Sequence, residues 1–144
     1  MDKIYINNTK NYYTKYFIDD KKRNTIIVSA GGGYLYTSPR ESYPVAKAFN
    51  DLGYHVAVIN YRETKEDKYP LPQKYFSIAL NEILKDDRIE SVIGLGFSAG
   101  GHNILEVALH HKEYNIRQFD LLMLGYPVIT SNKNYWHEGS FKNL

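Results

Sequence analysis

A serine between two glycines is the residue of this sequence best suited to chemistry. The stretch GLGFSAGGH, residues 94–102, places Ser98 directly after an apolar run, with Gly96 and Gly100 in a G-x-S-x-G pattern. That pattern is typical of a serine nucleophile on a sharp turn between a strand and a helix, where its hydroxyl stands above a sheet. Small residues let the turn approach its neighbours without a clash, and the helix start adds partial positive charge beside the hydroxyl.

The same nine residues also fit a second chemistry. Gly94, Gly96 and Ala99 satisfy G-x-G-x-x-A, the loop that holds the pyrophosphate of a dinucleotide. Such a site also expects an acidic residue about 20 positions later, at the carboxyl end of the next strand. The candidate acid, Asp120, comes before the next apolar segment rather than after it. The pattern therefore favours the nucleophile, and a dinucleotide-binding domain stays as the less favoured alternative.

A second glycine cluster follows an earlier apolar segment. The stretch SAGGGY, residues 29–34, ends that segment in Gly31, Gly32 and Gly33. Backbone N–H groups in such a cluster could bind the oxyanion of a tetrahedral intermediate. A plain turn between a strand and a helix is the alternative. Because both clusters end successive strands, the pair favours one shared site.

These motifs need a sheet beneath them, and the apolar segments predict it. Four continuous runs are typical of strands buried on both faces of a parallel sheet: residues 25–30, 55–61, 91–97 and 120–128. Helical spacing separates them, at about residues 39–52, 76–84 and 99–111. Right-handed crossovers then give an α/β fold, a parallel sheet with helices on both faces. Segments 3–6 and 12–19 alternate in hydrophobicity and predict an N-terminal antiparallel hairpin.

Local signals mark the first of these helices and its surroundings. Ser38, Pro39 and Glu41 resemble a capping box at its start, Pro44 is expected to restart it, and Gly53 is placed to end it. Glu41 and Arg62 could also form an ion pair beneath the second glycine cluster.

Composition narrows the possible partners. The chain has 144 residues, enough for a single domain over 1–144, with 43% hydrophobic and 24% charged residues and a net charge of +2. So small and mixed a charge indicates neither nucleic acid nor a membrane surface as partner. The chain has no cysteine, which excludes disulfides, thiol catalysis and zinc-thiolate sites. No signal peptide or membrane-length apolar run is visible, so we expect a cytoplasmic location, and no cluster has metal-ligand spacing.

Several segments together resemble a known family. GGGY, SPRESYPVAKAF, LGYHVAVINYR, YPLP, GFSAGGH and YPVIT are similar to the acetyl-esterase and lipase-like branch of the α/β-hydrolases, from about residue 26 to the end of the chain. The resemblance implies a carboxylic-ester hydrolase for short acyl groups, including acetylated sugars, that needs no cofactor. It implies Ser98 as the nucleophile and the amides of Ala99 and of Gly32 or Gly33 as oxyanion donors. One departure is that Ser29 and Ala30 stand where many members carry histidine.

Other side chains are candidates for binding the small-molecule ester. Tyr34 and Tyr126 fall near the carboxyl ends of expected strands, and His102 lies one turn into the helix after Ser98. We assign these three to the substrate pocket, although core packing explains each about as well.

The acid and the base of a catalytic triad are not assigned. The hydrolase order is serine, then acid, then histidine, and the resemblance places the last two after two further strands. The acids and histidines near or after Ser98 fit other roles: Glu106, Glu113, Asp120, Glu138, His102, His110, His111 and His137. Of these, His137 matches a family segment in the loop over the site, but not the catalytic histidine.

We therefore expect the N-terminal portion of a longer hydrolase, inactive alone. A non-catalytic binding module, or a subunit completed by another chain, is the alternative. The last apolar strand would be an unpaired edge, which favours self-association.

Overall fold

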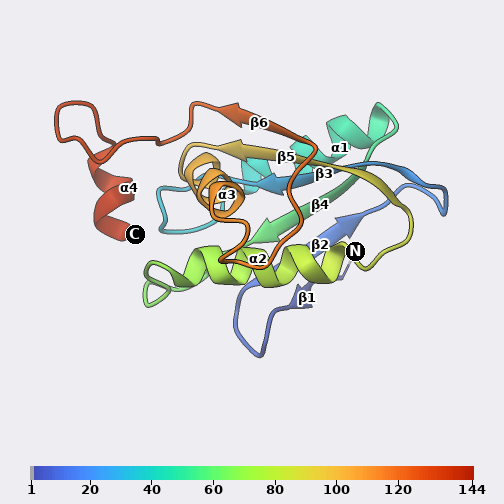
Figure 1. Cartoon of the computed structure of the whole chain (residues 1–144), viewed down its shortest axis with the longest axis horizontal. Helices are drawn as coiled ribbons and strands as arrows, with labels where there is room; N and C mark the ends of the chain where they lie inside the picture. Colours follow the sequence, from blue (N-terminus) through green and yellow to red (C-terminus); the bar gives the residue numbers. More distant parts are fainter. Residues whose placement is uncertain (1) are drawn as a thin grey trace.

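The computed structural model describes residues 2–144 and contains one six-stranded sheet. Its strands follow the order β1-β2-β4-β3-β5-β6 (Figure 1). Their bounds are Ile4–Tyr5 for β1, Tyr12–Tyr16 for β2, Arg23–Ser29 for β3, His55–Asn60 for β4, Ile89–Phe97 for β5 and Leu121–Gly125 for β6. Strands β4, β3, β5 and β6 are parallel, so the predicted α/β sheet is confirmed.

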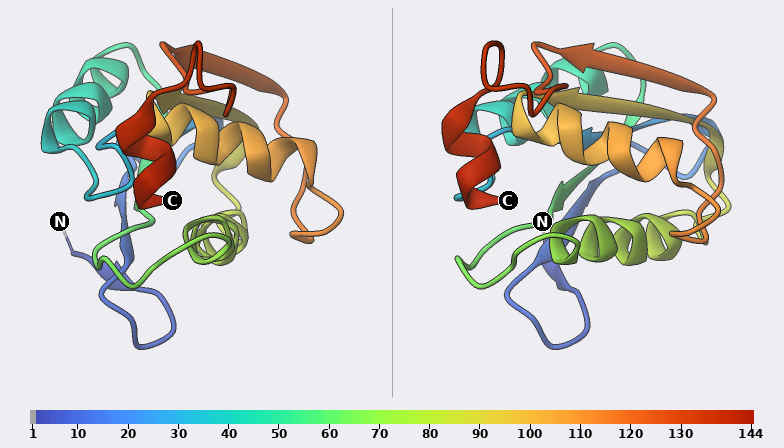
Figure 2. Two further views of the ribbon diagram at one scale, coloured as in Figure 1. Left: turned by 90° about the vertical axis from the view of Figure 1, so that its left-hand side faces the viewer. Right: turned by 60° about the vertical axis from the view of Figure 1, so that its left-hand side comes forward.

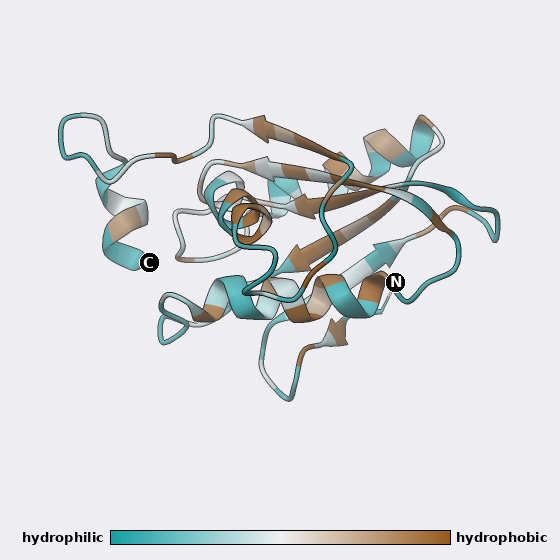
Figure 3. Ribbon diagram, in the orientation of Figure 1, coloured by the Kyte–Doolittle hydropathy of each residue, from teal (hydrophilic) through white to brown (hydrophobic). Residues whose placement is uncertain are grey.

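Helices cover both faces of this sheet. Their bounds are Tyr43–Asp51 for α1, Leu71–Ile83 for α2, Ala99–Leu109 for α3 and Glu138–Asn143 for α4. Successive strand residues point to opposite faces, so Ile26 packs in a core with Ala46 of α1, while Ile27 packs in a second core with Leu80 of α2 and Ile104 of α3. The apolar colouring of the central strands in Figure 3 follows from this burial on both sides. Within the part of the chain described, no helix combines the length and the apolar character needed to cross a bilayer.

The N-terminal hairpin is confirmed and also extends the main sheet. Strands β1 and β2 pair antiparallel, with Ile4 opposite Tyr13. Strand β2 then pairs antiparallel with β4, with Tyr13 opposite Ile59. Tyr13 faces the core below α2, which explains why the hairpin strand alternates in hydrophobicity.

The first helix is interrupted, and its capping box differs from the prediction. Residues Pro39–Glu41 form a separate 3₁₀ turn, η1, and α1 begins at Tyr43 with Pro44 in its first turn, as the predicted restart requires. Ser38 makes no side-chain capping bond, so the predicted capping box is wrong. The reason is that the Glu41 carboxylate, which would complete the box, accepts a hydrogen bond from the Gly31 amide instead. Gly53 follows α1 with a positive φ of 92°, as predicted for a C-terminal stop.

Helix α4 was not predicted and lies beyond the carboxyl ends of the parallel strands (Figure 1). Two cations bind the carbonyl groups at its end: Arg62 Nη1 donates to Asn143 O at 2.6 Å, and Lys68 Nζ donates to the same oxygen at 2.9 Å. Cations at a helix C-terminus are favoured by the helix dipole. The Asn143 side chain donates to Gly33 O at 2.9 Å, so α4 is attached to the second glycine cluster.

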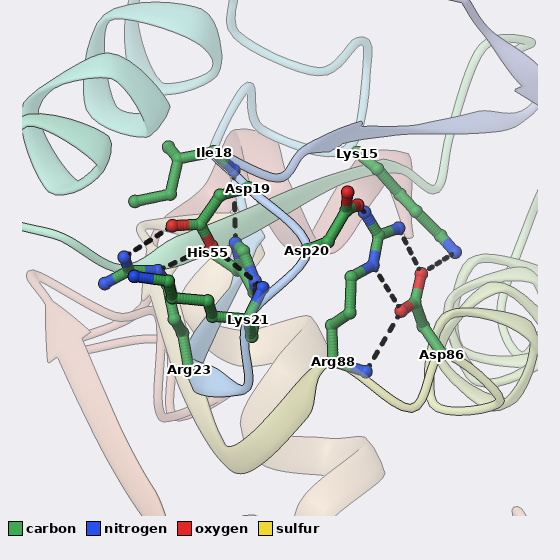
Figure 4. A network of polar contacts seen from close by, with 9 residues as sticks. All are labelled: Lys15, Ile18, Asp19, Asp20, Lys21, Arg23, His55, Asp86 and Arg88. Carbon is green, nitrogen blue, oxygen red and sulfur yellow. Dashed lines mark hydrogen bonds and ion pairs between the residues drawn. The ribbon is translucent and has the colours of Figure 1, made fainter.

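At the opposite end of the sheet, charged groups hold the turns together (Figure 4). Asp86 accepts hydrogen bonds from Arg88 Nη2 at 2.8 Å and from Lys15 Nζ of β2 at 2.9 Å, and its side chain is 9% exposed. The Arg88 guanidinium, with a smaller contribution from Lys15, holds the pKa of the Asp86 carboxyl well below its usual range. The cluster ties the segment after α2 to β2.

Asp86→Asn is expected to lower the free energy of unfolding by about 2 kcal/mol at pH 7, because it removes charge-assisted bonds at a nearly buried site. The folded pKa lies below the unfolded value of 3.8. The contribution is therefore complete above pH 3.8 and is lost as the pH falls through the folded pKa. Urea unfolding should show the two proteins converging in acid. Asp51→Asn, at an exposed helix pair with Lys47, is the control and should change little at any pH.

Candidate active site

Ser98 sits at the junction of β5 and α3 in a strained backbone conformation. Its φ of 50° and ψ of −121° lie in a region that costs a non-glycine residue about 1–3 kcal/mol. Two backbone hydrogen bonds hold it there: Ser98 N–H donates to Gly125 O at 3.0 Å, and Val128 N–H donates to Ser98 O at 3.1 Å. The segment after β6 therefore stabilises the strained turn.

The glycines around Ser98 are required by the packing of α3 against the sheet. A Cβ at Gly100 would lie 2.1 Å from Ser29 O, and one at Gly96 would lie 2.6 Å from Ile104 Cγ2. Gly94 likewise has Leu122 Cδ2 at 2.5 Å from an added Cβ. Close packing thus accounts for both glycines of the alternative G-x-G-x-x-A pattern.

The other features of a dinucleotide site are not formed. Strand β6 ends at Gly125, with Tyr126 and Pro127 after it, so it carries no acid at its carboxyl end. Asp120 lies at the amino end of β6, where it accepts hydrogen bonds from Val92 N–H and from Arg117.

Strained backbone gathers at the carboxyl edge of the sheet. Six non-glycine residues of the described chain have positive φ, and three of them are asparagines in turns. The other three are Tyr34, Ser98 and Tyr126, which follow β3, β5 and β6. Such strain concentrates at functional sites, where the surrounding structure must maintain it.

The second glycine cluster lies against Ser98. A Cβ at Gly31 would lie 3.1 Å from Ser98 Cβ, so the structure brings the two glycine motifs together. Gly32 and Gly33 have positive φ of 136° and 61°, which glycine adopts at little cost. Among the hydrogen bonds of residues 2–144, none uses the amide of Gly32, Gly33 or Ala99 as a donor. Gly32 and Gly33 are half-buried and Ala99 is buried, so these three amides lack an acceptor within the described chain.

Glu41 connects the glycine cluster to Tyr126, which follows β6. Its Oε2 accepts from Gly31 N–H at 2.6 Å, and its Oε1 accepts from the Tyr126 hydroxyl. The bond to Glu41, together with burial, raises the pKa of Tyr126 to about 12. The predicted pair of Glu41 with Arg62 is not formed, because Arg62 donates to the carbonyl groups of Thr64, Lys65 and Asn143.

A cavity of about 280 Å³ opens beside Ser98. Its lining comes from the segments after β5 and β6: Ser98, Tyr126, Pro127, Val128, Ile129, Thr130, Tyr135 and His137. Tyr126 is thus brought together with the serine. Tyr34 and His102 are not among the lining residues.

Comparisons with known proteins agree with this architecture. No family model matches the sequence. The α/β hydrolase MGS-M1, from a Medee basin deep-sea metagenome library, superposes with a TM-score of 0.83 and 28% identity over 94% of this chain. An acetyl ester-xyloside bifunctional hydrolase from Caldicellulosiruptor lactoaceticus superposes with a TM-score of 0.79 and 33% identity over 96% of this chain. The chain has the α/β-hydrolase fold.

The match covers only part of each relative. This α/β-hydrolase chain spans 60% and 56% of the two solved structures. A curated relative, endo-1,4-beta-xylanase B of Butyrivibrio fibrisolvens, is 31% identical over 88% of this chain, which spans 22% of that protein.

Tyr34 and His102 form a hydrogen-bonded chain below the site of this α/β-hydrolase. Gln73 Nε2 donates to the Tyr34 hydroxyl oxygen at 3.3 Å, so the phenolic hydrogen is directed to His102 Nδ1 at 2.8 Å. His102 then carries its own proton on Nε2. Burial lowers the pKa of His102 and raises that of Tyr34, which keeps both groups neutral at pH 7. Tyr34 is 1% exposed, so it reaches a ligand only through His102.

The family resemblance placed His137 in a loop over the site without giving it a role, and the structure puts it in the lining of the cavity. It precedes α4 and caps it, because its Nδ1 accepts from Ser140 N–H at 3.2 Å. In Figure 2, α4 lies beside the amino end of α3, where Ser98 stands. The signal in the sequence was a histidine three residues before a serine, at the start of a short helix. His110 and His111 directly follow α3, at the end opposite Ser98.

Proposed function

We propose that this α/β-hydrolase cleaves carboxylic esters with Ser98 as its nucleophile. One observation carries the proposal: a strained serine at the start of α3 lies against a glycine cluster in which the amides of Gly32 and Gly33 donate to no other group. In the proposed reaction Ser98 Oγ attacks the ester carbonyl carbon and the carbonyl oxygen becomes an oxyanion. The amides of Ala99 and of Gly32 or Gly33 stabilise that charge, and the amino end of α3 adds to the effect.

The proton of Ser98 has no acceptor among the described histidines. His102 Nδ1 accepts from Tyr34 and His137 Nδ1 accepts from Ser140, so both rings carry their hydrogen on Nε2. His55 lies at the amino end of β4, where it bonds to Ile18 N–H and Lys21 O. We infer that Ser98 is acylated slowly in residues 1–144 alone.

A non-catalytic binding module, or a subunit completed by another chain, is the second candidate function. It is favoured by the same observation, that the Nδ1 atoms of His102 and His137 already accept hydrogen bonds.

We further propose short acyl groups, acetyl above all, on a hydroxylated alcohol. The support is the relative named as an acetyl ester-xyloside hydrolase and the small cavity beside Ser98.

The test is acetylation by p-nitrophenyl acetate at pH 9, where hydroxide replaces the missing base. The alkyl ester formed on Ser98 has a much poorer leaving group than p-nitrophenyl acetate, so hydroxide hydrolyses it slowly and the acetyl group should remain on the protein. Peptide mass spectrometry should find it on Ser98, and Ser98→Ala should abolish it. Ser131→Ala, in the exposed loop after the cavity, is the matched control and should keep it. Acetylation spread over other serines, with Ser98 unmodified, would contradict the proposal.

We also propose that residues 1–144 self-associate through β6. No strand of residues 2–144 pairs with the outer edge of β6, and Leu121 there is 53% exposed. Unpaired backbone groups on an apolar edge can pair with a second chain. Light scattering should therefore detect dimers or larger species, and Leu121→Lys should shift the population to monomer. A stable wild-type monomer would exclude this pairing.

A further inference from the structure

The orientation of His137 is set by its neighbours. Ser140 N–H donates to Nδ1 at 3.2 Å, and Ser140 Oγ lies 2.8 Å from the same nitrogen. An N–H group can only donate, so Nδ1 is the acceptor and the ring hydrogen of the neutral imidazole is on Nε2. His137 therefore offers a donor on the edge of its ring that faces away from Ser140.

The position of that donor is also fixed. Ser140 lies near Gly33, whose added Cβ would be 3.9 Å from Ser140 Oγ. Asn143 of the same helix binds Gly33 O, and Arg62 holds the helix end. The short helix α4 thus ties His137 to the glycine cluster that lies against Ser98.

The cavity shared by Ser98 and His137 has a polar side and an apolar side. Pro127, Val128 and Ile129 supply the apolar wall. Thr130, Tyr135 and the His137 ring supply the polar wall, together with Tyr126, whose hydroxyl hydrogen is already donated to Glu41. An alkyl group would leave the His137 donor without a partner, whereas a ligand with hydroxyl groups would satisfy it. The glycine cluster follows β3, and this cavity lies on the β6 side of Ser98, so it is placed to take a part of the ester other than the oxyanion.

We propose that His137 is a specificity-determining residue: its Nε2–H donates to a hydroxyl or ring oxygen of the alcohol part of the ester. The residue selects esters of sugar-like alcohols over esters of simple alkanols. This inference rests on the proposed function, because it assumes that the ester carbonyl lies at Ser98. His137 is not the base, since its Nε2 is protonated.

Two measurements test this role. Nitrogen-15 NMR of the imidazole at pH 9 should show His137 with its hydrogen on Nε2. Methyl β-xyloside, a model of the alcohol part, should then protect Ser98 from acetylation by p-nitrophenyl acetate at pH 9.

His137→Leu should raise the xyloside concentration that gives half protection about tenfold, the effect of one lost hydrogen bond. Acetylation without xyloside is measured for each variant, and protection is expressed relative to that value. His137→Gln, which keeps a donor near the Nε2 position, should stay within about threefold, and His111→Leu is the matched control.

The outcomes separate the two proposals. If wild-type Ser98 is not acetylated, the proposed function fails. If Ser98 is acetylated but xyloside does not protect it, or protects wild type and His137→Leu equally, the role of His137 is wrong. A hydrogen on Nδ1 would also overturn it, and this NMR result does not depend on how well the variants fold.

Discussion

Residues 1–144 alone are expected to hydrolyse p-nitrophenyl acetate at pH 7 about 10⁶-fold more slowly than a serine hydrolase with its base in place. The loss follows from the protonation of the two nearest histidines. The Nδ1 atoms of His102 and His137 are occupied as acceptors, so neither ring presents a free nitrogen to Ser98. An unassisted serine hydroxyl is a poor nucleophile near neutral pH, and only the oxyanion amides remain to help. The steady-state rate of p-nitrophenolate release, compared with that of Ser98→Ala, measures the remaining activity that depends on Ser98.

Fast, Ser98-dependent turnover would contradict this expectation. The dependence of the rate on protein concentration would then show the source of the base. A rate proportional to protein concentration would mean that His102 or His137 leaves its partner and reaches the serine within one chain. A rate that rises with the square of concentration would mean that a second copy supplies the base. Ser140→Ala distinguishes further, because loss of its hydroxyl frees part of the acceptor capacity of His137 Nδ1.

The sheet could be predicted from sequence because its strands are buried on both faces. Runs such as residues 55–61 are mostly apolar and rich in β-branched residues, as expected of short strands buried on two sides. The handedness of their connections then places helices on both faces of the sheet. The details of η1 could not be predicted, since the Glu41 carboxylate can accept a hydrogen bond either at the predicted capping box of Ser38 or from the Gly31 amide. Its bond to Gly31 depends on where β3 ends relative to the loop.

The site divides in the same way. Ser98 and the glycine cluster carry local patterns, so their meeting at the carboxyl edge of the sheet could be predicted from the strand order. His137 was placed over the site only by the family resemblance, which gave it no role. It reaches the cavity only because α4 folds back over Gly33 and is held by Arg62, contacts that join residues far apart in the chain. Tyr34 was predicted at the pocket, but its positive φ places the ring below α3, where Gln73 and His102 use its hydroxyl.

Gly100→Ala is expected to lower the free energy of unfolding by about 3 kcal/mol or more, the upper range for overpacking. A Cβ at this position would lie 2.1 Å from Ser29 O and 2.3 Å from Ala30 O. Both obstacles are backbone atoms at the end of a central strand, so neither can rotate away as a side chain would. The helix must instead move off β3. For a domain of this size the change corresponds to a fall in Tm of roughly 10 °C.

The displacement of α3 should also separate Ser98 from the glycine cluster. Gly100→Ala should therefore lose acetylation at Ser98 even at temperatures where circular dichroism shows it folded, because the amides of Ala99 and Gly33 no longer face one oxygen. Gly139→Ala is the control: an added Cβ there would meet nothing closer than His137 Cε1 at 3.6 Å. Alanine within α4 should be neutral or stabilise by up to about 1 kcal/mol. If Gly100→Ala matches wild type in urea unfolding and in acetylation, α3 does not start against β3 as closely as the packing requires, and the serine is not held by that contact.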